Sequence, residues 1–162
     1  MKKTIKILLG VVAFFICTIV YGDVVKAETF PWPIDIKYGI TTGYYDYENH
    51  DGVDMAAGSG TPIYANFSGN AAFYQAYTTI NGKKYLTSYG NCVYVTSDDG
   101  KYFAIYGHMN AFNGYNLQIP STTTKQQSGS TGKITIGSRH VSEGELLGYV
   151  GSTGNSTGNH LH

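Results

Sequence analysis

The sequence is poor in cysteine, in charge and in helical periodicity. Its 162 residues include two cysteines, Cys17 and Cys92, and only 14% of the residues are charged. Cys17 lies in an N-terminal apolar stretch that we expect to be removed, so the mature chain can form no internal disulfide and its fold must rest on the core. Cys92, between Asn91 and Val93, is interpreted as a small buried residue.

The chain also lacks an excess of positive charge. It holds 11 basic and 11 acidic residues. Four of the basic residues and one of the acidic residues precede Glu28, which leaves seven basic and ten acidic residues after that point. Because no basic patch is present, we do not expect nucleic acid as a partner.

The N-terminal residues differ in composition from the rest of the chain. Lys2, Lys3 and Lys6 precede an apolar run over residues 8–21, which is too short to span a bilayer comfortably. Val25-Lys26-Ala27 is typical of a signal-peptidase site. We predict a secretory signal peptide, 1–27, and a single mature domain, 28–162. The mature protein is expected in the extracellular space and cell wall, as a monomer without stable membrane association.

What the mature chain has instead of helical periodicity is a β texture. Tyrosine, valine, isoleucine and threonine are frequent, and glycine interrupts the chain at short intervals. Asn81-Gly82 and Asp98-Asp99-Gly100 predict hairpin turns, and residues 121–131 predict an exposed loop. The expected fold is mainly β: a single antiparallel β-sheet domain with long loops that form a groove. Its predicted strands are 39–42, 62–65, 69–77, 91–96, 102–108, 133–136 and 146–150.

The last residues carry two histidines, His160 and His162, after a run of glycine, serine, threonine and asparagine that cannot hold a helix. In an extended segment, side chains two residues apart share a face, with Cα atoms roughly 6.6 Å apart. The pair therefore suits one small site, although such a pair also occurs on solvated strand edges.

Three further stretches could supply partners for this pair. His50 and Asp54 would be about 13 Å apart on a straight strand, so a shared site requires the bend that Gly52 permits. Asp51 and Asp54 could equally be solvated loop acids. His108 ends an alternating strand, whereas His140 is interpreted as an ordinary surface histidine.

Several motifs occur in one order along the chain. They are His50-Asp-Gly-Val-Asp-Met-Ala-Ala57, Gly60-Thr-Pro-Ile-Tyr-Ala65, Tyr106-Gly-His108, Glu143-Gly-Glu-Leu-Leu-Gly148, Gly151-Ser-Thr-Gly-Asn-Ser-Thr-Gly158 and His160-Leu-His162. In this combination the chain resembles the lysostaphin/LytM-type zinc metalloendopeptidases, a family of peptidoglycan endopeptidases. The resemblance covers residues 33–162 and is specific because the motifs keep their order.

The resemblance implies one zinc ion held by His50, Asp54 and His162, with a fourth position open for water. It leaves His108 and His160 as catalytic histidines, either of which could be the general base. It also implies a tyrosine that supports the transition state, for which Tyr44, Tyr45 and Tyr47 are all candidates, although packing or groove lining would explain them equally well.

The sequence departs from the family pattern in three places. Asn159 stands where the family has proline, and the stretch between His108 and Glu143 is longer than usual. The family also continues past the second histidine of the His-x-His motif with a further strand, so we expect that C-terminal strand to be missing here.

The implied function is a secreted, bacteriolytic zinc endopeptidase that cleaves peptides of peptidoglycan, in its cross-bridges or stem peptides. One alternative is a catalytically inactive family member that regulates by binding the cell wall or a partner, but such proteins usually lose ligands. Another is a structural metal site, which usually needs four closed positions and several cysteines, whereas only Cys92 is available.

Overall fold

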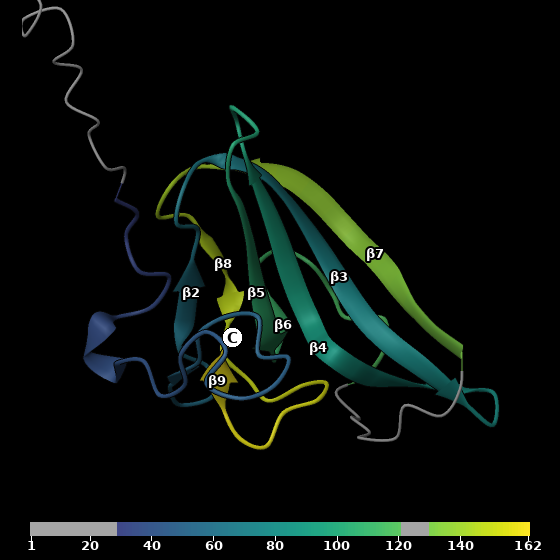
Figure 1. Cartoon of the computed structure of the whole chain (residues 1–162). Coiled ribbons are helices and arrows are strands. Elements are labelled where there is room, and N and C mark those ends of the chain that lie inside the picture. The colour runs from purple at the N-terminus through teal and green to yellow at the C-terminus, as the bar shows by residue number, and fades with distance from the viewer. Residues whose placement is uncertain (1–28, 121–129) are drawn as a thin grey trace, which may run out of the picture.

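The computed structural model describes residues 29–120 and 130–162, so the predicted signal peptide lies outside the described residues. Within these ranges the chain is mainly β, with one three-residue 3-10 helix, η1. The predicted fold class is confirmed (Figure 1). The elements are η1 (Ile36–Tyr38), β1 (Met55–Ala56), β2 (Pro62–Tyr64), β3 (Gly69–Ile80), β4 (Lys83–Ser97), β5 (Phe103–Met109), β6 (Ala111–Phe112), β7 (Ser130–Val141), β8 (Leu146–Tyr149) and β9 (His160–Leu161).

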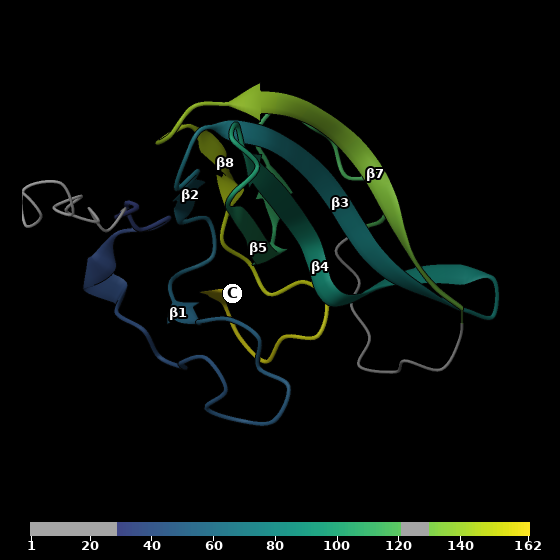
Figure 2. The ribbon, with the colours of Figure 1, turned by 45° about the horizontal axis from the view of Figure 1, so that its top comes forward.

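The strands form three antiparallel sheets. The largest has the order β5-β4-β3-β7, a second has the order β2-β8-β6, and β1 pairs with β9. In both views the long strands β3, β4 and β7 run together as one curved sheet, with β2 and β8 on its inner side (Figures 1 and 2). The core joins the two larger sheets, as shown by the Phe73 and Phe112 rings, whose centroids are 5.4 Å apart.

The long hairpin of β3 and β4 follows from its turn. Asn81 and Gly82 have φ values of 50° and 75°, the left-handed values that a two-residue hairpin turn needs. The predicted turn is confirmed, and so is the one at Asp98-Asp99-Gly100, where Gly100 has φ 71°. Both strands extend beyond their predicted ranges because pairing continues past the irregularity at Gln75 and Tyr77 as far as Ile80 and Lys83.

Two predicted segments need correction. The strand expected at 39–42 is wrong: η1 ends at Tyr38 with Gly39 as its C-cap, and only Thr42 forms an isolated bridge, with Asp54. The loop expected at 121–131 falls mostly on residues outside the described ranges, but Ser130 and Thr131 already belong to β7, which pairs along β3 as far as Val141. Pairing with β3, which the sequence pattern does not reveal, lengthens β7 well beyond 133–136.

The two residues interpreted as unremarkable have the expected environments. Cys92 is fully buried, and burial raises the pKa of its thiol to about 12. His140 is exposed on β7, where its Nε2 lies 2.9 Å from Asp98 Oδ1. Among the described residues, no helix has the length and apolar character needed to cross a bilayer.

Candidate metal centre

The site is assembled where the two short strands β1 and β9 meet. Met55 pairs with Leu161, and Ala56 pairs with His160, so the residues that flank these strands come together. Asp54 directly precedes β1, and its backbone is fixed by an N–H donated to Thr42 O and a carbonyl that accepts from Thr41 N. The C-terminal residues therefore lie beside β1 although more than 100 residues separate the two in sequence (Figure 2).

Alternation along β9 directs two histidines to the site: His160, the first residue of the strand, and His162, which follows it. Leu161 is 3% exposed and belongs to the hydrophobic core. His160 and His162 lie on the other face, and His162 O accepts a hydrogen bond from Gly107 N at 2.8 Å. The expectation that the two histidines share a face is confirmed, because both reach the carboxylate of Asp54.

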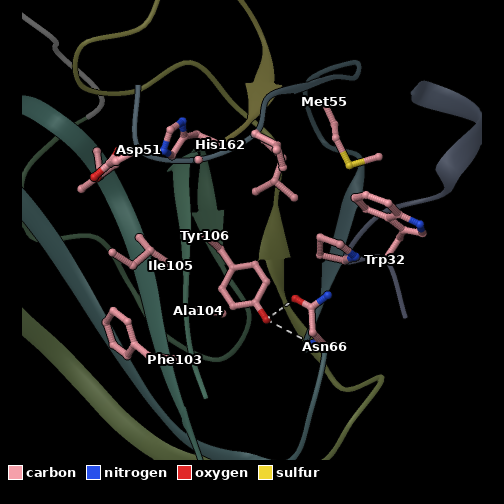
Figure 3. Close-up of a pocket in the computed structure, with 14 residues that line it drawn as sticks. Trp32, Asp51, Met55, Asn66, Phe103, Ala104, Ile105, Tyr106 and His162 are labelled. Carbon is pink, nitrogen blue, oxygen red and sulfur yellow. Dashed lines mark hydrogen bonds and ion pairs between the residues drawn. The ribbon is translucent and has the colours of Figure 1, made fainter. Parts of the chain in front are cut away.

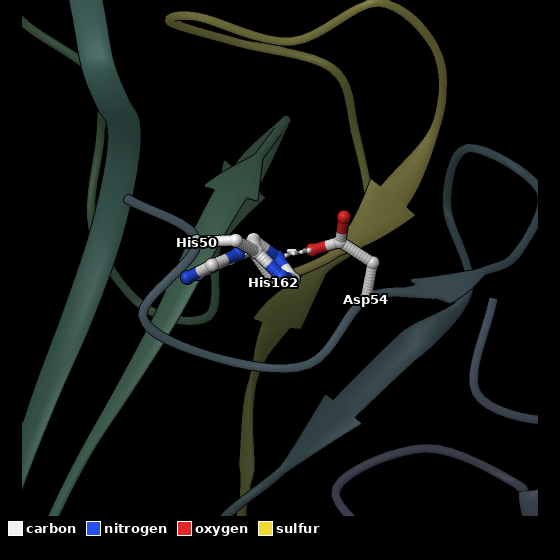
Figure 4. A group of neighbouring side chains, drawn as sticks. All are labelled: His50, Asp54 and His162. Carbon is white, nitrogen blue, oxygen red and sulfur yellow. Dashed lines mark hydrogen bonds and ion pairs between the residues drawn. The ribbon is translucent and has the colours of Figure 1, made fainter. Parts of the chain in front are cut away.

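Three side chains converge closely enough to hold one metal ion. His50, Asp54 and His162 each offer a ligand atom, and these atoms all lie within 4.8 Å of one another (Figure 4). Asp54 Oδ1 is 3.2 Å from His50 Nε2 and 2.9 Å from His162 Nδ1. The three residues assigned by the resemblance as ligands are thus brought together.

His50 is held in a form suited to metal binding. Its side chain is 2% exposed, and Nδ1 donates to Gly43 O at 2.6 Å. Because a neutral imidazole carries one N–H, this bond leaves Nε2 unprotonated. Nε2 is buried without a hydrogen-bond partner. This unpartnered nitrogen, the Asp54 carboxylate and the His162 imidazole together form the donor set of a catalytic zinc site.

Asp54 is ionised in this environment. Burial alone would raise the pKa of its carboxyl group, but the neighbouring imidazoles of His50 and His162 outweigh burial and lower the pKa below its usual value. An ionised carboxylate that is 13% exposed provides the negative charge that a divalent cation requires.

The bend between His50 and Asp54 occurs at Gly52, as expected, but for a different reason. The φ of Gly52 lies outside the left-handed region, so backbone freedom does not demand glycine there. A Cβ at this position would lie 2.7 Å from His162 Nε2 and 3.0 Å from its Cε1. Glycine is needed because the ring of His162 packs directly on the backbone.

We expect Gly52→Ala to displace the His162 ring and weaken metal binding by at least about tenfold, because a site loosened by even a fraction of an ångström loses its ligand geometry. Zinc affinity measured by competition with a chelator checks this. Gly58→Ala is the matched control, since a Cβ there meets no atom within 4 Å. Equal affinities for the two variants would contradict the steric explanation.

His108 lies in β5 beside the three clustered residues, and its backbone has φ 59°, an unusual value for a residue other than glycine. Its Nδ1 donates to Thr153 O at 2.8 Å. Burial lowers the pKa of His108 to about 4. At neutral pH the ring is therefore uncharged, with an unprotonated Nε2 that can accept a proton.

His160 has a similar hydrogen-bond pattern. Its Nδ1 donates to Gly158 O at 2.9 Å, and its Nε2 is 3.6 Å from Asp54 Oδ1. The rings of His108 and His160 are 4.6 Å apart. The structure thus brings all five predicted site residues into one cluster.

The three tyrosines that precede His50 occupy different positions. Tyr47 stacks on the His50 ring at 4.6 Å, and Tyr44 and Tyr45 pack edge-to-face against each other at 4.5 Å. All three are at least 58% exposed. Support of a transition state by any one of them stays a prediction.

Sequence reasoning missed two residues at the site. Tyr89, in β4, donates its hydroxyl hydrogen bond to Asp51 Oδ2 at 2.7 Å, and Asp51 Oδ1 lies 3.5 Å from His162 Nε2. Asp51 had a weak signal, its position next to His50, but it was indistinguishable from a solvated loop acid. Tyr89 had none, because nothing in a strand sequence reports a contact with a loop 38 residues earlier.

A cavity of about 390 Å³ adjoins the site, with His162 and Asp51 at one end (Figure 3). Its walls include apolar residues of β5 and of the N-terminal segment, among them Phe103, Ile105 and Trp32. A second hollow of about 490 Å³, which Tyr89 also lines, lies over β3, β4 and β7. The predicted groove of long loops over the site stays a prediction.

Comparison with known proteins gives one family match. Residues 48–132, just over half of the chain, match the model of peptidase family M23. The DD-carboxypeptidase/endopeptidase Mpg of Neisseria meningitidis serogroup B is 34% identical over 113 residues, which are 70% of this chain and 19% of that protein. The glycyl-glycine endopeptidase ALE-1 of Staphylococcus capitis is 29% identical over 132 residues, which are 82% of this chain and 26% of that protein.

The chain therefore spans about a fifth to a quarter of the length of these curated relatives. Among solved structures, a mutant of the catalytic domain of the prophage-encoded M23 protein EnpA from Enterococcus faecalis superimposes with a TM-score of 0.50 at 26% sequence identity. That likeness covers 84% of this chain and 82% of the other. Sequence and structural likeness thus point to the same family.

Proposed function

Because the chain belongs to peptidase family M23, we propose that it is a secreted zinc metalloendopeptidase that hydrolyses peptide bonds in bacterial peptidoglycan. The observation that carries this proposal is the convergence of five side chains: His50, Asp54 and His162 as a ligand set, with His108 and His160 beside them.

His50, Asp54 and His162 would hold the metal. Two imidazoles and one carboxylate, with ligand atoms within 4.8 Å of one another, are the three protein ligands typical of a catalytic zinc site. A zinc ion bound there would supply Lewis acidity, which polarises a substrate carbonyl and acidifies a water molecule. The buried, unpartnered Nε2 of His50 favours a metal ligand over a structural hydrogen bond.

His108 and His160 would move the proton. Each donates its Nδ1 hydrogen to a backbone carbonyl, Thr153 O or Gly158 O, so each keeps Nε2 free to accept. In peptide hydrolysis one such nitrogen takes the proton of the attacking water and returns a proton to the leaving amine. The backbone bonds keep both rings oriented while this transfer takes place.

The substrate class is drawn from the relatives. Their names refer to DD-peptide bonds and to glycyl-glycine bonds. We therefore propose stem peptides or cross-bridges of peptidoglycan as the substrate, with the bond cleaved in the cell wall outside the membrane. The predicted signal peptide, residues 1–27, supports this location.

The experiment uses the purified chain loaded with zinc, intact peptidoglycan, a pentaglycine peptide and a peptide that ends in D-Ala-D-Ala, with products identified by mass spectrometry. We expect cleavage of peptidoglycan and of one of the two peptides. Because the Lewis acid contributes several kcal/mol, a chelator should lower the rate by at least about 100-fold, and added zinc should restore it. Zinc-loaded protein that binds peptidoglycan without cleaving it would instead support a non-catalytic role.

A further inference from the structure

His162 differs from the other histidines of the site in how its ring nitrogens are used. His50, His108 and His160 each donate Nδ1–H to a backbone carbonyl, at 2.6, 2.8 and 2.9 Å. These three rings therefore present Nε2 to the site. His162 instead points Nδ1 at Asp54 Oδ1, 2.9 Å away, and its Nε2 lies toward Asp51.

This reversal creates a requirement that the other three rings do not have. A neutral imidazole binds a metal through its unprotonated nitrogen, so His162 can offer Nδ1 only if Nε2 carries the proton. An acceptor next to Nε2 stabilises that tautomer, and metal-binding histidines generally have such an acceptor. The group that Nε2 faces is the carboxylate of Asp51, whose Oδ1 lies 3.5 Å away.

We propose that Asp51, held in place by Tyr89, is a positioning residue that directs Nδ1 of His162 to the metal. The inference rests on the proposed function, since it assumes that His162 is a ligand. Asp51 and Tyr89 would then affect metal affinity through the tautomer and orientation of the His162 ring.

Asp51 needs a support because its side chain is 59% exposed. An exposed carboxylate rotates freely and contributes little to an ion pair. The Tyr89 hydroxyl restricts that freedom by donating to Asp51 Oδ2 at 2.7 Å, which leaves Oδ1 for His162. Tyr89 itself lies in β4. Two residues further along this strand, Asn91 N donates a hydrogen bond to Thr153 Oγ1 at 2.9 Å, which helps to fix the strand.

The segment 50–54 holds the His162 ring on two sides. Asp54 faces Nδ1, Asp51 faces Nε2, and Gly52 between them packs against the ring so closely that a Cβ would lie 2.7 Å from Nε2. The loop thus fixes which nitrogen points inward. The metal ligand Asp54 and the positioning residue Asp51 belong to the same short segment.

Zinc affinity measured by chelator competition tests the proposal on Asp51→Asn, Tyr89→Phe and the double variant. Loss of an outer acceptor typically weakens metal binding by 10- to 100-fold, and the exposure of Asp51 places the expected loss near the lower limit, about tenfold. Tyr89→Phe keeps the aromatic ring and should cause a smaller loss. In the Asp51→Asn background it should cause no further loss, because Tyr89 acts through Asp51.

The visible absorption of the cobalt-substituted protein gives a readout that a general loss of stability would not change. We expect Asp51→Asn to shift the cobalt bands because the His162 ring is no longer held in one orientation. Tyr94→Phe, on the same strand, is the matched control and should keep wild-type affinity and spectrum.

Two results would overturn the inference. Wild-type zinc affinity and an unchanged cobalt spectrum in Asp51→Asn would remove Asp51 from the role. Additive losses from Asp51→Asn and Tyr89→Phe would show that Tyr89 does not act through Asp51. If wild-type protein bound no zinc at all, the proposed function would fail and the inference with it, whereas tight zinc binding unaffected by Asp51→Asn would refute the inference alone.

Discussion

The His50→Ala variant is expected to purify without zinc while keeping its β-sheet structure. His50 supplies the buried Nε2 that has no other partner, and its removal leaves only Asp54 and His162 as ligands. Loss of an outer partner already weakens metal binding by 10- to 100-fold, so loss of a ligand should exceed about 100-fold. Elemental analysis and chelator competition measure the effect.

The fold should survive this substitution. His50 precedes β1, and the paired strands of the two larger sheets do not include it. Circular dichroism should therefore report an unchanged sheet. His140→Ala is a suitable control because His140 is exposed on β7 and pairs with Asp98, and it should keep one zinc per chain. Stoichiometric zinc in purified His50→Ala would exclude His50 as a ligand.

The second large effect is expected for His108→Asn, which should retain zinc and lose peptidoglycan hydrolysis by about 100-fold or more. General acid–base catalysis contributes about 10²- to 10⁴-fold, and Asn removes the accepting nitrogen. Asn is preferred to Ala here because it tolerates the φ of 59° that His108 adopts. It also leaves less empty space at a residue that is 6% exposed.

His160→Ala extends this test to the other imidazole, and the ratio of the two losses shows which ring contributes more to the proton transfer. Zinc content and rate are measured on the same samples, so that loss of metal and loss of catalysis are distinguished. If His108→Asn or His160→Ala lost its zinc, that histidine would be a ligand, and its role and that of a neighbour would have to be exchanged.

Strands and turns of the sheets could be predicted from the sequence where the local residue types determine the backbone conformation. Asn81-Gly82 adopts the left-handed values that the hairpin turn requires, and residues 62–64 form β2 within the range expected. The length of β7 could not be predicted, because Ser130 to Gly132 are strand residues only through their pairing with β3. The residues at 39–42 have strand-like composition, but they directly follow η1, and only Thr42 pairs, in an isolated bridge with Asp54.

The features of the site likewise fall into those that could be identified from the sequence and those that could not. His50, Asp54, His108, His160 and His162 were identifiable from motifs in a fixed order, and all five converge. Contacts that depend on tertiary approach were not identifiable. The hydroxyl of Tyr89 reaches Asp51, a loop residue, from β4, and the need for Gly52 comes from a ring 110 residues later in the chain.

The alternation of side chains along β9 also links correct assembly of the metal centre to the stability of the fold. Leu161 is fixed in the core opposite Met55, between two histidines that face the metal centre. A slip of this strand by one residue would exchange the faces, placing an imidazole in the core and leucine at the metal centre. Such a molecule would lose core packing and metal ligands together. Misfolded copies would therefore be unstable ones, open to proteolysis, and a stable but inactive form in the wrong register would not accumulate.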